Sequence, residues 1–189
     1  KVNQSKYLYV EDSDISGEDD NAIDFVGVQY GHVVGNKIHN AGDWCIYTKG
    51  GSHGLRVEGN EIYNCGVGGY LAGQGTGFQY MTPPWIYYEA SDIKFVNNVI
   101  HDTGTAGMGV NGGYNILLAH NTLYRVGIGH RGNRADHLFE ANFGSQGCDD
   151  TDERALCSSN RAAGGWGLAN PGTEVPIPNK NVYVYNNLF

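Results

Sequence analysis

Val33-Val34-Gly35-Asn36-Lys37-Ile38 returns 24 residues later as Val57-Glu58-Gly59-Asn60-Glu61-Ile62. The same spacing of an asparagine between apolar residues recurs in residues 95–100, 118–123 and 184–189, and residues 10–15 carry a weaker copy with Ser13 in its place. These five asparagines are 24, 38, 23 and 66 residues apart, so the two longer gaps exceed one period by about 14 and about 43 residues. A repeat of this length is typical of stacked coils, each of which packs against its neighbours.

Each repeat carries two short strand patterns separated by a glycine-rich bend. The residue two positions after the asparagine is always a branched aliphatic one: Ile15, Ile38, Ile62, Ile100 and Leu123. A second apolar alternation follows ten to twelve positions after the asparagine, and glycine occupies the bend between them four times: Gly42, Gly66, Gly104 and Gly127. Because no helix-length apolar stripe is present, the pattern predicts an all-β fold, a right-handed parallel β-helix of five to six coils of about 23 residues.

Two columns of side chains are expected to stack along the axis of this solenoid. Parallel coils lie about 4.8 Å apart, so each asparagine amide can donate to the carbonyl oxygen of the next and form a ladder. Three positions after the asparagine the repeats carry Ser16, His39, Tyr63, His101 and Tyr124. We interpret this second column as a structural stack of planar rings, not as the place of a catalytic histidine.

The composition excludes two classes of protein. Lys and Arg number 12 against 20 Asp and Glu, and the formal net charge of −8 argues against a general nucleic-acid binder. No apolar run reaches the length that a membrane-spanning helix needs. We expect a single β-helix domain over residues 1–189 that is a fragment of a longer chain, because neither end carries a polar cap, and homo-assembly through the open coil ends is a further expectation.

The four cysteines are assigned from their positions in the sequence. Cys148 and Cys157 are nine residues apart and are expected to close a small loop as a disulfide, which would indicate an oxidising, extracellular compartment. Cys45 and Cys65 fall nine and five positions after their asparagines, at different places around the coil. We therefore expect these two to remain unpaired, as small buried residues.

The two long gaps mark insertions, at residues 73–91 and 127–179, which leave neighbouring coils and are expected to lie close together. Exposed aromatic rings beside a flat sheet suit the C–H faces of sugars, although such rings can also simply anchor the loops. The candidate substrate-binding residues are Tyr80, Trp85, Tyr87, Tyr88, Asn111, Arg131 and Trp166. Asp149, Asp150 and Asp152 are candidate ligands of Ca²⁺, which is the candidate cofactor; a solvated acidic loop is the simpler interpretation of that cluster.

Lys49 is the first candidate for catalysis. Period-two alternation turns it outward on the sheet and exposes it beneath the first insertion, close to Tyr47 and with His53 on the following turn. A neutral lysine amine can remove the C5 proton of a uronic acid and so begin a β-elimination. Asp24 and Glu89 are a second candidate set, a carboxylate pair for glycoside hydrolysis whose separation the sequence does not give.

A family resemblance supports Lys49. Residues 43–53, Asp-Trp-Cys-Ile-Tyr-Thr-Lys-Gly-Gly-Ser-His, together with the repeat at residues 57–62, resemble the bacterial right-handed parallel β-helix repeat proteins. The stretch is also loosely similar to β-helical polysaccharide lyases of the chondroitinase B and alginate lyase type. In that family a lysine at the position of Lys49 is the base and an arginine one coil later assists. Here residues 69–74 contain no arginine, and Asp43 alone stands for the acidic calcium ligands before the lysine.

Two functions follow from these features. The first is an extracellular, carbohydrate-active β-helix that binds an acidic polysaccharide and cleaves it by β-elimination if Lys49 is catalytic. The alternative is a non-catalytic structural or adhesive extracellular module of a surface layer or filament, which the incomplete lyase pattern favours. Both make a polysaccharide or another copy of the chain the expected partner.

Overall fold

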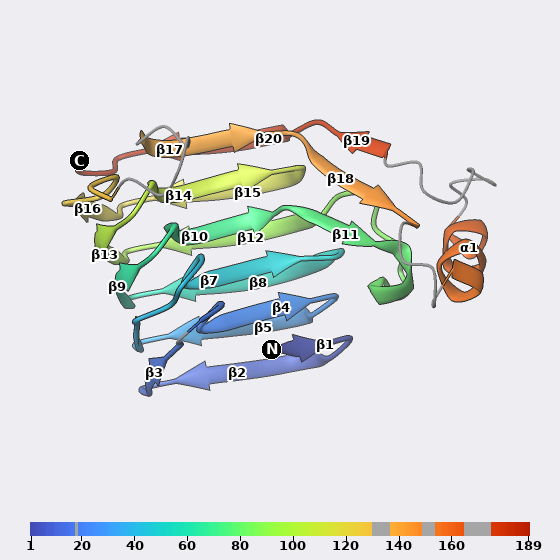
Figure 1. Cartoon of the computed structure of the whole chain (residues 1–189), viewed down its shortest axis with the longest axis horizontal. Coiled ribbons are helices and arrows are strands. Elements are labelled where there is room, and N and C mark those ends of the chain that lie inside the picture. Colours follow the sequence, from blue (N-terminus) through green and yellow to red (C-terminus); the bar gives the residue numbers. More distant parts are fainter. Residues whose placement is uncertain (18, 130–136, 149–153, 165–174) are drawn as a thin grey trace.

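The computed structural model describes residues 1–17, 19–129, 137–148, 154–164 and 175–189, which form a parallel β-helix (Figure 1). Sheet A consists of β1 (Val2–Asn3), β4 (Ile23–Val26), β7 (Ile46–Lys49), β10 (Gly68–Gly73), β14 (Ala106–Asn111) and β17 (His137–Asn142). Sheet B consists of β2 (Lys6–Glu11), β5 (Gln29–Val34), β8 (Ser52–Glu58), β12 (Ala90–Val96), β15 (Gly113–Ala119) and β20 (Lys180–Tyr185). Sheet C consists of β3 (Asp14–Ser16), β6 (Lys37–His39), β9 (Glu61–Cys65), β13 (Val99–Thr103) and β16 (Thr122–Tyr124).

The predicted all-β solenoid is confirmed, but its coils contribute strands to three sheets and not to two. The strand of sheet B escaped the pattern because it always contains a residue with positive φ. These residues are Tyr7, Tyr30, Gly54, Asp92, Asn115 and Asn181. A left-handed residue within a strand interrupts the alternation by which strands are recognised, so the segment before each asparagine did not read as a strand.

The repeated asparagines stack at the bend between sheets B and C. The amide of Asn36 donates to Oδ1 of Asn60 at 3.0 Å, Asn60 donates to Asn98 at 2.9 Å, and Asn98 donates to Asn121 at 3.0 Å. Asn121 continues the series to Asn187 at 3.0 Å. The acceptor oxygens also take the backbone N–H of the preceding asparagine, at 2.9 or 3.0 Å. These bonds satisfy polar groups that a bend would otherwise bury without partners.

The ring column on sheet C is formed as well. His39, Tyr63, His101 and Tyr124 stack face to face, with centroid distances of 4.8, 5.0 and 4.7 Å. Nε2 of His39 lies 2.6 Å from a carboxylate oxygen of Asp14, which holds the imidazole within the column. The rings therefore form the expected structural stack.

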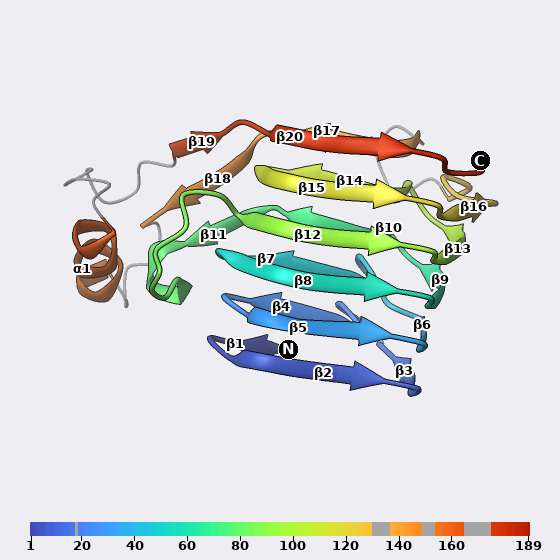
Figure 2. The same ribbon diagram turned by 180° about the vertical axis from the view of Figure 1, so that it is seen from behind.

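Both insertions interrupt the connection from sheet A to sheet B. The first contains β11 (Gly75–Gly77) and the 3₁₀ helix η1 (Phe78–Tyr80), and the second contains β18 (Gly144–Gly147), α1 (Arg154–Ala163) and β19 (Val175–Ile177). Because they leave the solenoid at the same edge, they lie together, as predicted, at the side of the coils away from sheet C (Figures 1 and 2). Strand β11 pairs with β18, and the amide of Asn160 donates to the carbonyl oxygen of Phe78 at 3.0 Å.

Two details of the second insertion differ from the prediction. Strand β17 lies within the predicted 127–179 segment but is a regular strand, paired in parallel with β14. Its inward Phe139 packs against the core, but the polar His137 and Glu140 on the same strand hid the apolar pattern. The segment between sheets A and B therefore begins only after Asn142.

Helix α1 is the second difference, since no helix was expected. The helix sequence, Arg-Ala-Leu-Cys-Ser-Ser-Asn-Arg-Ala-Ala, contains one large aliphatic side chain, Leu156, which is 52 % exposed; it therefore lacks the broad apolar stripe by which a helix is recognised. It is held instead by the disulfide of Cys157 and by Arg161, whose guanidinium lies 5.3 Å from the centre of the Phe78 ring. Within the described part of the chain no helix combines the length and the apolar character that crossing a membrane requires.

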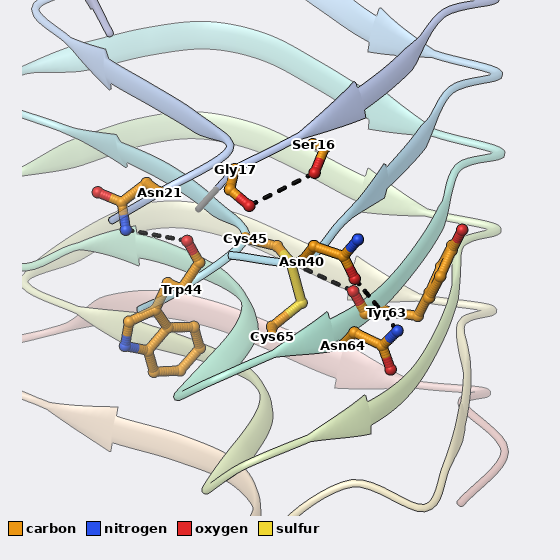
Figure 3. The surroundings of a disulfide bond; sticks show 9 residues. All are labelled: Ser16, Gly17, Asn21, Asn40, Trp44, Cys45, Tyr63, Asn64 and Cys65. Atoms are coloured by element: carbon orange, nitrogen blue, oxygen red, sulfur yellow. Dashed lines mark hydrogen bonds between the residues drawn. A yellow bond between two sulfur atoms is a disulfide. The ribbon is translucent and has the colours of Figure 1, made fainter. Parts of the chain in front are cut away.

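Cys45 and Cys65 form a disulfide, contrary to the prediction that they stay unpaired (Figure 3). They belong to successive coils and lie on opposite sides of the bend between sheets C and A, with their Cα atoms 5.4 Å apart. Both side chains point into the core and are at most 1 % exposed. Inward side chains on the two sides of a tight bend converge, so different positions along the coil do not keep them apart. Cys148 and Cys157 form the expected second disulfide.

Candidate functional site

The outer face of sheet A carries two columns of side chains defined by the strand register. The first column contains Asp24, Tyr47, Leu71, Gly109 and Glu140, and the second contains Val26, Lys49, Gly73, Asn111 and Asn142. Tyr47 and Leu71 face away from the main core but are not exposed, because they pack with Trp44, Val67 and Ala106 in a small apolar cluster of their own. The sheet therefore offers a firm, partly aromatic floor on its outer side.

A cleft of about 420 Å³ lies where this floor meets the first insertion. We call it the basic cleft; its lining residues are Lys1, Val26, Lys49, Gly75, Thr76, Gly77, Gln79 and Tyr80. Two ammonium groups face it, and Asp24 is the carboxylate between them, 3.5 Å from Nζ of Lys1 and 3.9 Å from Nζ of Lys49. Nζ of Lys1 also lies 5.8 Å from the centre of the Tyr80 ring. The cleft thus combines positive charge, one aromatic wall and small glycine surfaces.

Lys49 is not the exposed side chain that the sequence predicted. Its side chain is 16 % exposed, its ammonium donates to Oε1 of Gln74 at 2.8 Å, and it lies 4.5 Å from the centre of the Tyr47 ring. The amide of Gln74 in turn donates to the hydroxyl of Tyr47 at 2.9 Å. Gln74 belongs to the first insertion, so the insertion covers Lys49 and fixes its direction. The lysine and the tyrosine hydroxyl are therefore held by one amide.

Glu89 lies beneath the basic cleft and is completely buried. Its Oε2 accepts a hydrogen bond from the hydroxyl of Thr76 at 2.6 Å and one from the backbone N–H of Gly50 at 3.1 Å. Burial raises the pKa of the Glu89 carboxyl from 4.5 to about 7, because desolvation outweighs these two bonds and the smaller opposing effects of Gln146 and Lys49. A carboxyl that ionises near neutral pH thus supports one wall of the cleft.

A second cleft, of about 350 Å³, follows along the same face. We call it the polar cleft; its lining residues are Trp44, Tyr47, Leu71, Gln74, Thr105, Asn111, His137, Glu140 and Asn142. The amide of Asn111 donates to Oε1 of Glu140 at 2.7 Å, and Nε2 of His137 lies 3.3 Å from the other carboxylate oxygen. Gln74 lines this cleft and accepts a hydrogen bond from Lys49 of the basic cleft, so the two clefts are adjacent on the outer face of sheet A.

The structure separates the predicted catalytic set. Lys49 and Tyr47 lie together on sheet A, but His53 lies on sheet B, with Nδ1 3.2 Å from the carbonyl oxygen of Gly51 and its ring nearly perpendicular to that of Tyr30. His53 is 5 % exposed, pairs in register with sheet B residues and is not among the residues that line the basic cleft. His53 lies apart from Lys49 because the sharp turn at Gly50 and Gly51 redirects the chain from one sheet to the next.

The predicted aromatic residues are also divided. Tyr80 lines the basic cleft. Trp85 instead packs against the apolar cluster that contains the Cys148–Cys157 disulfide, and Tyr88 stacks on Tyr114 of sheet B with centroids 4.9 Å apart. Tyr87 packs perpendicular to Tyr88, with centroids 5.3 Å apart, and is 40 % exposed. Most of these rings therefore anchor the first insertion, the simpler of the two interpretations considered.

Several predicted residues lie outside the described residues. They are Arg131, Trp166, Asp149, Asp150 and Asp152. In the described ranges no group of three or more His, Cys, Asp or Glu side chains is arranged to hold a metal ion. The calcium prediction thus stays a prediction.

Other site residues were missed by sequence reasoning. Lys1, Gln74 and Thr76 carry no motif, and their role appears only when the first insertion folds back over sheet A. Glu140 and His137 were missed because β17 was not recognised as a regular strand. Had β17 been aligned with β14, Glu140 would have fallen beside Gly109 on the outer face.

Comparisons with known proteins agree with this architecture. A periplasmic alginate epimerase, AlgG, superposes with a TM-score of 0.55 over 98 % of this chain at 15 % identity, and this chain spans 41 % of its length. The enzymatically active domain of tailspike protein 2 of bacteriophage CBA120 superposes with a TM-score of 0.54 over 95 % of this chain at 10 % identity, and this chain spans 24 % of it. At these identities the likeness establishes the fold alone. No curated protein matches the sequence at a significant level.

The sequence itself carries a family signature. The profile described as "Right handed beta helix region" matches residues 1–143, which contain strands β1 to β17 and the whole first insertion. The chain belongs to the right-handed β-helix family.

Proposed function

We propose that this chain is an extracellular protein that binds an acidic polysaccharide along the outer face of sheet A. The observation that carries the proposal is the basic cleft, where the ammonium groups of Lys1 and Lys49 face the same space and Asp24 offsets only one of the two charges. The Tyr80 ring provides a wall against which the C–H face of a sugar can stack. Charge pairing in a partly enclosed cleft favours a carboxylate-bearing sugar over a neutral one.

Two further observations support the proposal. All four cysteines are paired in disulfides, which persist in oxidising compartments outside the cytosol. The similar solved structures include an alginate epimerase and an enzymatically active tailspike domain, and we extend polysaccharide recognition from the first of these to the present chain as part of the proposal. The basic and polar clefts together cover strands β4 to β17, five coils of the solenoid. At about 4.8 Å per coil this strip is long enough for several sugar units.

Cleavage by β-elimination is a second candidate function. It is favoured by the series Lys49–Gln74–Tyr47, which holds an amine that could act as base beside a phenol hydroxyl that could act as acid. Binding has the stronger support, because Lys49 is engaged as a hydrogen-bond donor and lies over the Tyr47 ring, contacts that suit a cation holding an anionic ligand. The alternative, a non-catalytic structural or adhesive module of a surface layer or filament, requires no turnover.

The test compares Lys49→Met with Lys37→Met in the full-length protein. Lys37 is an exposed lysine on sheet C, so the control removes the same charge away from both clefts. Binding is measured by calorimetric titration with polygalacturonate, alginate and hyaluronan. Lys49→Met should bind at least about tenfold more weakly than the wild type, a loss of about 1.4 kcal/mol in binding free energy. Lys37→Met should keep the wild-type affinity. Equal binding by both variants, or no binding of any polymer by the wild type, would overturn the proposal.

The same samples decide between binding and cleavage. Turnover is followed as ultraviolet absorbance of the unsaturated product. Product formed by the wild type and lost in Lys49→Met establishes the lyase, whereas binding without product establishes the non-catalytic module.

A further inference from the structure

Strands β12, β15 and β20 lie side by side in sheet B (Figure 2), and their outer face carries a hollow of its own. It measures about 430 Å³ and is lined by Asp92, Ile93, Lys94, Asn115, Leu117, Tyr183 and Tyr185. None of these residues lines the basic or the polar cleft. From this hollow we propose a second carbohydrate-binding site, specific for an uncharged pyranose unit of a glycan.

The register explains why the surface is hollow at this place. Lys94, Leu117 and Tyr183 occupy the same position on three successive strands, so the shorter leucine lies between two longer side chains. Beside them, Tyr185 of β20 is paired with Ala119 of β15, whose side chain is short. The floor of the hollow is therefore apolar and low, and its ends are formed by tall side chains.

Two tyrosines form an aromatic wall. Tyr183 and Tyr185 are two residues apart on β20, so both rings project from the same face of the strand, about 7 Å apart along it. They are 49 % and 50 % exposed, although rings of this size gain by being covered. A pyranose ring presents a face of C–H groups of comparable width, which is the surface that tyrosine rings recognise.

The opposite side of the hollow is polar and has no net charge. The amide of Asn115 donates to Oδ1 of Asp92 at 2.5 Å, and both residues adopt positive φ, so the pair is held at the sheet surface by the backbone. The remaining oxygen of Asp92 can accept from a sugar hydroxyl, and Lys94 can donate to another. Because one carboxylate and one ammonium face the hollow together, the charges balance. This rim favours an uncharged sugar with vicinal hydroxyls, in contrast to the basic cleft on sheet A.

The test is ligand-detected NMR saturation transfer on the full-length protein with maltotetraose, cellotetraose and mannotetraose, and with tetragalacturonate as the charged probe. We expect saturation transfer to at least one neutral probe from the wild type. The double variant Tyr183→Ala/Tyr185→Ala should weaken that binding at least about tenfold, whereas Tyr183→Phe/Tyr185→Phe, which keeps both rings, should retain it.

Two controls separate this site from a loss of folding and from the site on sheet A. Tyr9→Ala removes an equally exposed ring, 58 % exposed, from the other end of the same outward column of sheet B and should bind as the wild type. Lys49→Met should also leave the neutral probes bound, whatever it does to acidic polymers. The inference is overturned if no neutral probe binds, if tetragalacturonate alone depends on the two tyrosines, or if the alanine pair binds as tightly as the wild type.

Discussion

The buried carboxyl of Glu89 should make the protein less stable as the pH rises from 4.5 to about 7. Its pKa is raised from 4.5 to about 7 by burial, so across this window the folded state keeps a proton that the unfolded state has lost. The associated stabilisation is fully present below the unfolded pKa and is lost as the pH rises through the folded pKa. This shift in pKa corresponds to about 3 kcal/mol of unfolding free energy.

The substitution Glu89→Gln isolates this effect. Glutamine keeps the shape of the side chain, and its amide oxygen can still accept from the Thr76 hydroxyl and the Gly50 N–H, but it does not titrate. The variant should therefore gain about 3 kcal/mol relative to the wild type between pH 4.5 and pH 8, whatever the absolute stability of either protein is. Most of the gain should fall between pH 5 and pH 7, at no more than about 1.4 kcal/mol per pH unit.

Urea unfolding of both proteins, without reductant and followed by fluorescence at half-unit steps of pH, measures this difference. A stability difference that stays constant from pH 4.5 to pH 8 would show that Glu89 ionises alike in the folded and unfolded chains. If the variant instead loses stability relative to the wild type as the pH rises, Thr76, Gly50 and Lys49 stabilise the carboxylate more than burial destabilises it. Either result would refute the reasoning.

Three further predictions concern the scaffold. Asn60→Ala removes four hydrogen bonds in the core of the bend and should cost about 4 kcal/mol of unfolding free energy, measured by urea unfolding. Replacing Cys45 and Cys65 together by alanine releases a loop of 20 residues and should cost about 3 kcal/mol of unfolding free energy. Thermal unfolding with and without reductant checks this, because added reductant should lower the melting temperature of the variant less than that of the wild type. Gly73→Ala would place a methyl group 1.9 Å from a backbone oxygen and should prevent normal folding. Gly59 also has a positive φ but has open space around it, so Gly59→Ala should cost only about 1 kcal/mol of unfolding free energy. Thermal melting followed by circular dichroism distinguishes the two variants.

The features that the sequence predicted are those that repeat with the coil. In a solenoid, residues that are one coil length apart in the sequence become neighbours along the axis. Aligning Asn36 with Asn60 therefore places Ile38 next to Ile62 and His39 next to Tyr63, and the observed register agrees. The direction of Lys49 on sheet A followed from the same alignment. Single positions were predictable because neighbouring coils constrain each of them in the same way.

The errors arose where a residue meets something other than its vertical neighbour. Cys45 pairs across a bend with Cys65, which lies 20 residues away and at another position of the coil. Gln74 reaches back from the first insertion to cover Lys49, so exposure inferred from strand direction alone was wrong. Neither contact has a counterpart in another coil, and therefore no periodic comparison could reveal it.

This division between scaffold and insertions also bears on how the clefts are built. The floor of the basic and polar clefts belongs to sheet A, whose register is set by the repeated coil, but Gln74, Thr76 and Tyr80 come from the first insertion. Glu89 joins the two parts, since it accepts one hydrogen bond from Thr76 of the insertion and one from Gly50 of the coil turn. A change in Glu89 should therefore alter the wall of the basic cleft without moving its floor. Binding at the tyrosine wall of sheet B, which shares no lining residue with that cleft, should be the same in Glu89→Gln as in the wild type.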